Sequence, residues 1–190
     1  MDGLNVMNPK QETLWVLRAQ AGDRAALEEV LKIVQEPLYR YIHRLVGEHQ
    51  LAQDILQEVF IRIYRKLGWL NEPELFRPWA YRIASREAFR LLRREKRWKE
   101  QVRDEEVLEA IPAREMEDPL TSELIAHLPQ LIAGLSPASR AVLILHYLDE
   151  MPLTEVAEVL GIALGTVKSR LAYGLESLRR GIVPNLTTER

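Results

Sequence analysis

Apolar residues recur at helical spacing along most of the chain, and no alternating pattern long enough to predict a strand is present. In the first third, Asp23 follows a glycine and can cap a helix over about residues 24–34. Pro37 suits the first position of a further helix, which Gly47 then ends. The next apolar stripe predicts a helix over about residues 51–67.

The middle of the chain is less regular. Residues 68–78 contain two prolines and little periodicity, which predicts a loop with about one turn, and a helix is predicted over residues 79–99. The stretch that follows is acidic, has few aromatic residues and contains Pro112 and Pro119. This composition is typical of a linker, which we place at residues 100–121.

Helical periodicity resumes near Ser122. Ser136 followed by a proline predicts a capped helix that ends near residue 148. Two more helices are predicted over about residues 153–160 and 164–180. The expected fold is therefore all-α, with two small helical domains, residues 10–99 and 122–184, joined by the acidic linker.

Composition narrows the class of protein. Of the 190 residues 47% are hydrophobic and 28% charged, as in soluble globular proteins. No apolar run approaches the ~20 residues that span a bilayer, and the first ten residues do not resemble a secretory signal. Cysteine is absent, so disulfides and thiolate chemistry are excluded. We expect a cytoplasmic protein without membrane insertion.

Charge is distributed in blocks that the net charge of −2 conceals. Residues 77–99 hold nine basic and two acidic side chains, whereas residues 100–126 hold nine acidic and two basic ones. A basic segment in a nearly neutral chain suggests a polyanionic partner.

On a helical wheel the arginines of residues 79–99 gather within an arc of roughly 120°. Trp79 and Ile83 fall in the same arc, and Trp69 and Phe76 precede it in the loop. Arginine suits phosphates and aromatic rings stack on unpaired bases, so this helix is predicted to bind single-stranded nucleic acid. The arc contains Arg82, Arg86, Arg90, Arg93, Arg94 and Arg97.

The spacing of Ala157, Gly161 and Val167 is typical of a helix-turn-helix, whose second helix enters the major groove of DNA. Small Ala157 suits a close helix crossing, and Gly161 can adopt the left-handed conformation that ends a helix. Side chains able to bond bases and phosphates are predicted on the outer face of the second helix. They are Thr166, Lys168, Ser169, Arg170, Tyr173 and Ser177.

The helix over residues 51–67 has a polar face that composition alone predicts to be solvated, with exposed Ile61 as the only indication of a partner. The four histidines are scattered, and no phosphate loop, nucleophile elbow or paired-carboxylate motif is present. We therefore predict no catalytic residue, no metal site and no cofactor.

Three motifs, in this order, resemble an extracytoplasmic-function (ECF, group IV) sigma factor of bacterial RNA polymerase: "DILQEVFIRIYRKL", "FRPWAYRIASREAFRLLRREKR" and, after the acidic linker, "LTEVAEVLGIALGTVKSRL". The resemblance extends from about Glu12 to Arg180. It implies a non-enzymatic protein that binds the clamp helices and the flap of core polymerase. The first domain would read and melt the −10 element, the second would read the −35 element, and an anti-sigma factor is a candidate partner.

The resemblance also implies site residues. Polymerase would meet Asp54, Gln57, Glu58, Ile61 and Arg62. The melted −10 strand would meet Trp69, Asn71, Phe76, Arg77, Trp79, Arg82, Ile83, Arg86, Arg90, Arg93 and Arg94. The −35 duplex would meet Thr154, Thr166, Lys168, Ser169, Arg170 and Tyr173.

The chain departs from the family pattern at four positions. Arg86 and Arg90 replace the usual asparagine and aspartate, and Tyr173 and Leu175 replace two arginines. Fewer phosphate contacts predict weaker −35 affinity and a smaller dependence on salt. The alternative interpretation is a two-domain helix-turn-helix regulator that binds duplex DNA without polymerase. It does not account for Trp79 among arginines.

Overall fold

A computed structural model describes residues 8–94, 128 and 131–186, and in the last six of these the backbone alone. Three predictions lie outside these ranges: the linker at residues 100–121, the start of helix near Ser122, and the place of Arg97 on the basic face. All regular secondary structure among the described residues is helical, and these residues include no strand. None of their helices is both long enough and apolar enough to traverse a lipid bilayer.

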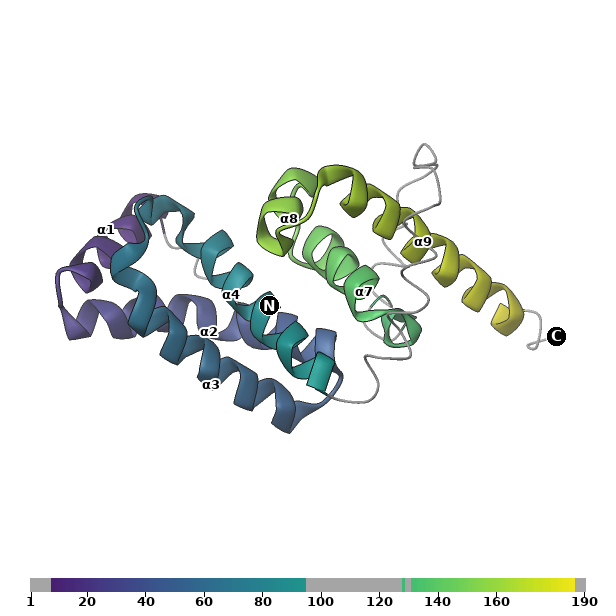
Figure 1. The fold of residues 1–190 in the computed structure, drawn as a ribbon, viewed down its shortest axis with the longest axis horizontal. Helices are drawn as coiled ribbons and strands as arrows, with labels where there is room; N and C mark the ends of the chain where they lie inside the picture. The colour runs from purple at the N-terminus through teal and green to yellow at the C-terminus, as the bar shows by residue number, and fades with distance from the viewer. Residues whose placement is uncertain (1–7, 95–127, 129–130, 187–190) are drawn as a thin grey trace.

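The first group of helices comprises α1 (Pro9–Gln20), α2 (Arg24–Val46), α3 (His49–Lys66) and α4 (Phe76–Arg94). Two single 3-10 turns, η1 (Leu67–Trp69) and η2 (Pro73–Leu75), connect α3 to α4. A loop is therefore present where one was predicted, but it has two turns instead of about one, and α4 begins at Phe76, before the predicted residue 79. α2, α3 and α4 pack against one another and α1 lies on α2 (Figure 1).

The second group begins with the 3-10 turn η3 (Ile132–Gly134) and α7 (Pro137–Leu143), which continues as one π-helical turn, η4 (Ile144–Leu148). It ends with α8 (Leu153–Leu160) and α9 (Leu164–Leu186). α7 packs on α9, and α8 packs on both α9 and α4, so the two groups are in contact (Figure 1).

Local sequence signals account for most helix boundaries. The side chain of Asp23 accepts a hydrogen bond from the backbone N–H of Ala26 and so begins α2. Ser136 caps α7 in the same way through Ser139. Gly47 and Gly161 end α2 and α8 in the left-handed conformation, with φ of 77° and 68°.

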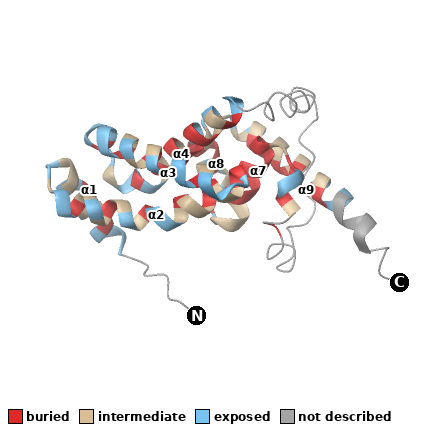
Figure 2. Cartoon of the chain, turned by 90° about the horizontal axis from the view of Figure 1, so that it is seen from below, coloured by how far each residue is buried: buried red, intermediate tan, exposed pale blue. Residues whose placement is uncertain are grey.

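The prediction that a helix begins at Pro37 is wrong. α2 runs through Pro37 without a break, although proline cannot donate the hydrogen bond that its position requires. The apolar stripe continues across it, because Val34, Leu38 and Ile42 are all buried. Burial of this stripe against α3 and α4 outweighs the local cost, and Figure 2 shows the buried positions on the faces that the helices turn toward one another.

Candidate nucleic-acid interface

The basic face of α4 forms on the side opposite its buried residues. Ala80, Ala84 and Ala88 are buried, and their small side chains let neighbouring helices approach closely. The arginines lie across the helix from them, partly buried at Arg82 and exposed at Arg86, Arg90, Arg93 and Arg94. Trp79 is partly buried at the edge of this face. The structure thus brings most of the predicted −10 residues together on one surface.

Of the remaining predicted −10 residues, Trp69 and Asn71 lie in the loop before α4, Arg77 pairs with Glu12 of α1, and two are buried. Phe76 is fully buried and Ile83 is 9% exposed. Phe76 begins α4 and joins the core, where its ring lies 6.2 Å from that of Trp79. Ile83 falls at the boundary of the arginine arc, where an aliphatic side chain gains more by turning toward the core than toward water. Both residues support the surface from below.

A buried carboxylate lies beneath this basic face. Glu87, whose side chain is 5% exposed, lies 2.7 Å from Nε of Arg62 on α3 and 2.8 Å from Nε of Arg90. Nε of Arg62 also lies 3.2 Å from Oε1 of Glu58. Neither ion pair of this Nε has the alignment of a hydrogen bond. Glu87 therefore orients one arginine from each of two predicted surfaces.

Beside the basic face, the loop between α3 and α4 forms one wall of a hollow of about 210 Å³. This is smaller than the ~300–1,000 Å³ typical of small-molecule sites. Trp69 is 76% exposed at its rim, and Trp79 and Arg82 contribute from α4. Glu158 of α8 lines the same hollow. Flat aromatic rings beside an arginine suit an unpaired base.

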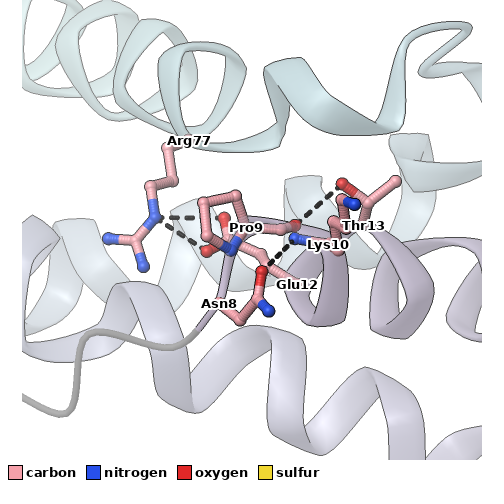
Figure 3. Close-up of polar contacts among 6 residues, drawn as sticks. All are labelled: Asn8, Pro9, Lys10, Glu12, Thr13 and Arg77. Atoms are coloured by element: carbon pink, nitrogen blue, oxygen red, sulfur yellow. Dashed lines mark hydrogen bonds and ion pairs between the residues drawn. The ribbon is translucent and has the colours of Figure 1, made fainter.

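Two side chains of α1 hold this loop, and sequence reasoning missed both. The side-chain amide of Gln20 donates to the backbone oxygens of Leu67 and Leu70. At the other end of the loop, Arg77 donates through Nε to both carboxylate oxygens of Glu12 (Figure 3). The partners are 47 to 65 residues apart in sequence, so no local pattern could have indicated these bonds.

The outer face of α3 carries the predicted polymerase residues. Asp54 and Gln57 are exposed, Glu58 and Arg62 are partly exposed, and Ile61 is 37% exposed. Tyr64, which the sequence analysis did not single out, is 67% exposed. Its position three residues after Ile61 was the available signal, because residues three apart lie on the same side of a helix.

The helix-turn-helix prediction is confirmed by α8, the left-handed Gly161 and α9, with Val167 and Leu171 buried. Thr154 and Lys168 are exposed. Four further residues of the predicted −35 set are partly exposed along α9: Thr166, Ser169, Arg170 and Tyr173. Leu175 is 4% exposed, so its apolar side chain belongs to the core. The adjacent Gly174 allows close packing, since a Cβ there would lie 2.8 Å from Cδ1 of Leu143.

Polar groups join the two helix groups at their boundary. Arg140, 8% exposed, donates to the backbone oxygens of Ile132, Ala133 and Leu135 and, across the boundary, to that of Leu45. Asp149 lies on the same boundary. Burial raises the pKa of its carboxyl to about 6, against the opposing effects of Arg44, Arg40 and the hydroxyl of Tyr81.

The described residues contain no cluster of three or more histidine, cysteine, aspartate or glutamate side chains that could hold a metal ion.

Comparison with known families gives two matches. Residues 31–98, which run from α2 through α4, match the family described as Sigma-70 region 2. Residues 125–178, which include α7, α8 and most of α9, match Sigma-70, region 4.

Several curated proteins are similar over nearly their whole length. The ECF RNA polymerase sigma factor SigW of Bacillus subtilis is 32% identical over 176 residues, which cover 87% of this chain and 93% of SigW. The RNA polymerase sigma-H factor of Pseudomonas aeruginosa is 30% identical over 190 residues, covering 95% and 98% of the two chains.

Solved structures share the fold at lower identity. CnrH, in complex with the cytosolic domain of CnrY, has a TM-score of 0.66 at 18% identity and covers 91% of this chain and 97% of its own. The sigma factor RpoE of Bartonella quintana, in complex with the anti-sigma factor NepR, has a TM-score of 0.59 at 20% identity, with 86% and 98% covered.

Proposed function

Because the chain belongs to the extracytoplasmic-function family of sigma factors, which direct RNA polymerase to promoters, we propose that three of its surfaces divide this work. Residues 10–99 bind the polymerase clamp helices and capture the melted −10 strand. Residues 122–184 bind the −35 duplex and the polymerase flap. The acidic residues 100–121 connect them and pass through the polymerase.

The polymerase surface is the outer face of α3. Its support is the exposure of Asp54, Gln57 and Ile61 on a helix whose other face is fully engaged in the core. Exposed Tyr64 extends the same face. An apolar centre with charged neighbours is the composition of a protein interface rather than of a nucleic-acid site.

The −10 surface is the basic face of α4 with the hollow beside it. The observation that carries this proposal is that Arg82, the first arginine of the row on α4, lines the same hollow as Trp69 and Trp79. Arginines attract the phosphates, and each base that stacks on an aromatic ring gains about 1–3 kcal/mol, which favours the melted over the paired strand. Phe76 and Ile83 support this surface and do not contact the strand.

The −35 surface is the exposed side of α8 and α9. Lys168 and Arg170 supply phosphate contacts, while Thr166, Ser169 and Tyr173 can reach base edges in the major groove. Ser169 donates to the backbone oxygen of Gly165 in the absence of DNA, and it would exchange this bond for one to DNA.

We place this activity in the cytoplasm, where the polymerase acts. An anti-sigma factor is the protein partner that we expect, because two proteins of the same fold were solved with CnrY and NepR.

Promoters are first selected by transcription of genomic fragments with purified core polymerase and this protein. Two variants are then compared on these promoters to test the division of labour. Asp54→Ala combined with Glu58→Ala should weaken binding to core polymerase. Trp79→Ala should leave that binding unchanged and reduce open-complex formation. Glu28→Ala combined with Glu36→Ala removes two charges from α2 outside all three surfaces and serves as the control.

Equal effects of the two variants in the polymerase-binding assay would refute the division. Tight binding of the wild-type protein to promoter duplex without any binding to polymerase would instead favour the regulator that acts alone.

A further inference from the structure

The loop between α3 and α4, residues 67–75, contains few groups that could fix its own conformation. Leu67 at its start and Phe76, which begins α4 directly after it, are buried, but Trp69, Asn71, Glu72 and the other residues at its tip are mostly exposed. Two 3-10 turns supply its only regular structure. A segment with so little burial is held by its polar contacts.

The first such contact comes from Gln20 at the end of α1. Its Nε2 donates to the backbone oxygens of Leu67 at 2.9 Å and Leu70 at 2.8 Å. These two oxygens flank Gly68 and Trp69, so one amide fixes the backbone on both sides of the exposed tryptophan. Both bonds are partly buried, which protects them from competition by water.

The second contact comes from Glu12, two turns earlier on the same helix. Its side chain is 11% exposed, and its two oxygens lie 3.0 and 2.9 Å from Nε of Arg77. Figure 3 shows the two terminal nitrogens of Arg77 on the side away from the carboxylate. Glu12 therefore fixes the guanidinium while these terminal nitrogens remain available for a phosphate.

We propose that Gln20 and Glu12 are positioning residues for capture of the melted strand. This inference rests on the −10 surface proposed above. α1 packs against both η1 and η2, and its two side chains anchor the two ends of one loop. The anchored loop keeps Trp69 and Asn71 opposite Trp79 and Arg82, so an unpaired base meets a preformed site and less freedom is lost on binding.

The test uses three variants of α1. Gln20→Leu removes the amide donor at similar size, and Glu12→Gln removes the charge. Gln20→Lys restores a donor for the two backbone oxygens. Thr13→Val is the matched control, because Thr13 donates to the backbone oxygen of Pro9 within α1 and does not reach the loop (Figure 3).

Each variant is bound to core polymerase and titrated with a single-stranded −10 oligonucleotide from the selected promoters. The same oligonucleotide is then used with one base at a time removed. We expect Gln20→Leu and Glu12→Gln to weaken binding of the intact strand about tenfold. The variants should bind the strand that lacks the captured base about as well as the wild type does, because that strand has no base for the loop to hold. Gln20→Lys should recover most of the loss, and Thr13→Val should match the wild type.

Amide hydrogen exchange provides a readout that needs no DNA. Backbone amides of residues 68–75 should exchange faster in Gln20→Leu and Glu12→Gln, while amides in the centres of α2 and α3 keep their wild-type rates. The midpoint of thermal unfolding of every variant is measured alongside.

The outcomes separate the two proposals. If the wild type does not prefer the intact strand, the −10 surface itself is wrong. If the wild type shows the preference and the variants retain it, only the positioning role is wrong. Equal weakening of intact and abasic strands, or a loss of polymerase binding, would make Gln20 and Glu12 general stabilising residues and would also overturn the inference.

Discussion

The carboxylate of Glu87 lies 2.7 Å from Nε of Arg62, and this ion pair joins α4 to α3. The two helices carry different proposed surfaces, one for the promoter and one for polymerase. Arg90, on the promoter side, lies 2.8 Å from the same carboxylate. A nearly buried anion thus compensates two arginines at once.

Replacing Glu87 with glutamine should destabilise the fold, because both arginines lose their partner while the site stays largely buried. Arg62 and Arg90 can still turn toward water, so we expect a loss of about 1–3 kcal/mol, below the range for fully buried pairs. Denaturant unfolding measures it. Glu29→Gln is the control, since its pair with Lys32 is exposed and such pairs contribute at most about 1 kcal/mol. Similar losses in both variants would contradict the role given to Glu87.

Arg140 should be among the least replaceable residues of the second helix group. Methionine fills similar space but removes the donor to four backbone oxygens. The oxygen of Ile132 keeps the backbone N–H of Leu135, whereas those of Ala133, Leu135 and Leu45 lose the arginine without another donor being present among the described residues. We expect Arg140→Met to lower the free energy of unfolding by on the order of 3 kcal/mol. Arg140→Lys should recover only part of this, because a single ammonium group cannot reach all four oxygens. Full recovery by lysine would show that charge alone matters.

Asp149 should make stability depend on pH between about 4 and 6. Its carboxyl pKa is raised from 3.8 to about 6 by burial, so the folded state binds a proton more tightly than the unfolded state. The contribution to stability is complete below pH 4 and is lost as pH rises through about 6. One carboxylate oxygen has no hydrogen-bond partner, which agrees with a preference for the neutral form.

Asp149→Asn should therefore unfold like the wild type near pH 4 and be more stable at pH 7.5, by at most about 3 kcal/mol. Thermal unfolding across this pH range measures the difference. Glu150→Gln, at the exposed neighbouring position, is the control. A constant difference between Asp149→Asn and the wild type at all pH values would contradict the assignment.

The effect of Gly174→Ala on stability should change sign according to the side chain at position 143. Alanine favours a helix over glycine by about 1 kcal/mol, but here its Cβ would lie 2.8 Å from Cδ1 of the fully buried Leu143. We expect the substitution to destabilise the native background and to stabilise a Leu143→Ala background, where the space is open. A double-mutant cycle measures the coupling, and additive effects would show that Leu143 moves aside at no cost.

Local signals predicted most of the helices. Asp23, Ser136 and Gly161 each determine a helix end through atoms within four residues, and such short-range bonds are visible in a sequence pattern. α8 accordingly lies where it was predicted. α9 continues to Leu186, beyond the predicted residue 180.

The parts of the site that depend on distant contacts could not be predicted. The helical wheel placed Ile83 with the arginines, but the core of the folded chain buries it. Glu12 and Gln20 acquire their partners only when α1 folds onto the loop. Pro37 failed as a boundary signal for the same reason, because burial on both sides of it outweighs the local preference.

The contact between α8 and α4 adds a free-energy cost to promoter binding if the −10 and −35 surfaces act as proposed. The −35 and −10 elements are roughly 25 base pairs apart, or about 85 Å along the duplex at 3.4 Å per step, and helices in contact cannot occupy both. On the surfaces proposed above, the described arrangement gives way to an extended one before both elements are bound. On the same proposal, the affinity for a promoter is lowered in proportion to the fraction of the protein in the extended form, and polymerase raises that affinity by binding this form preferentially.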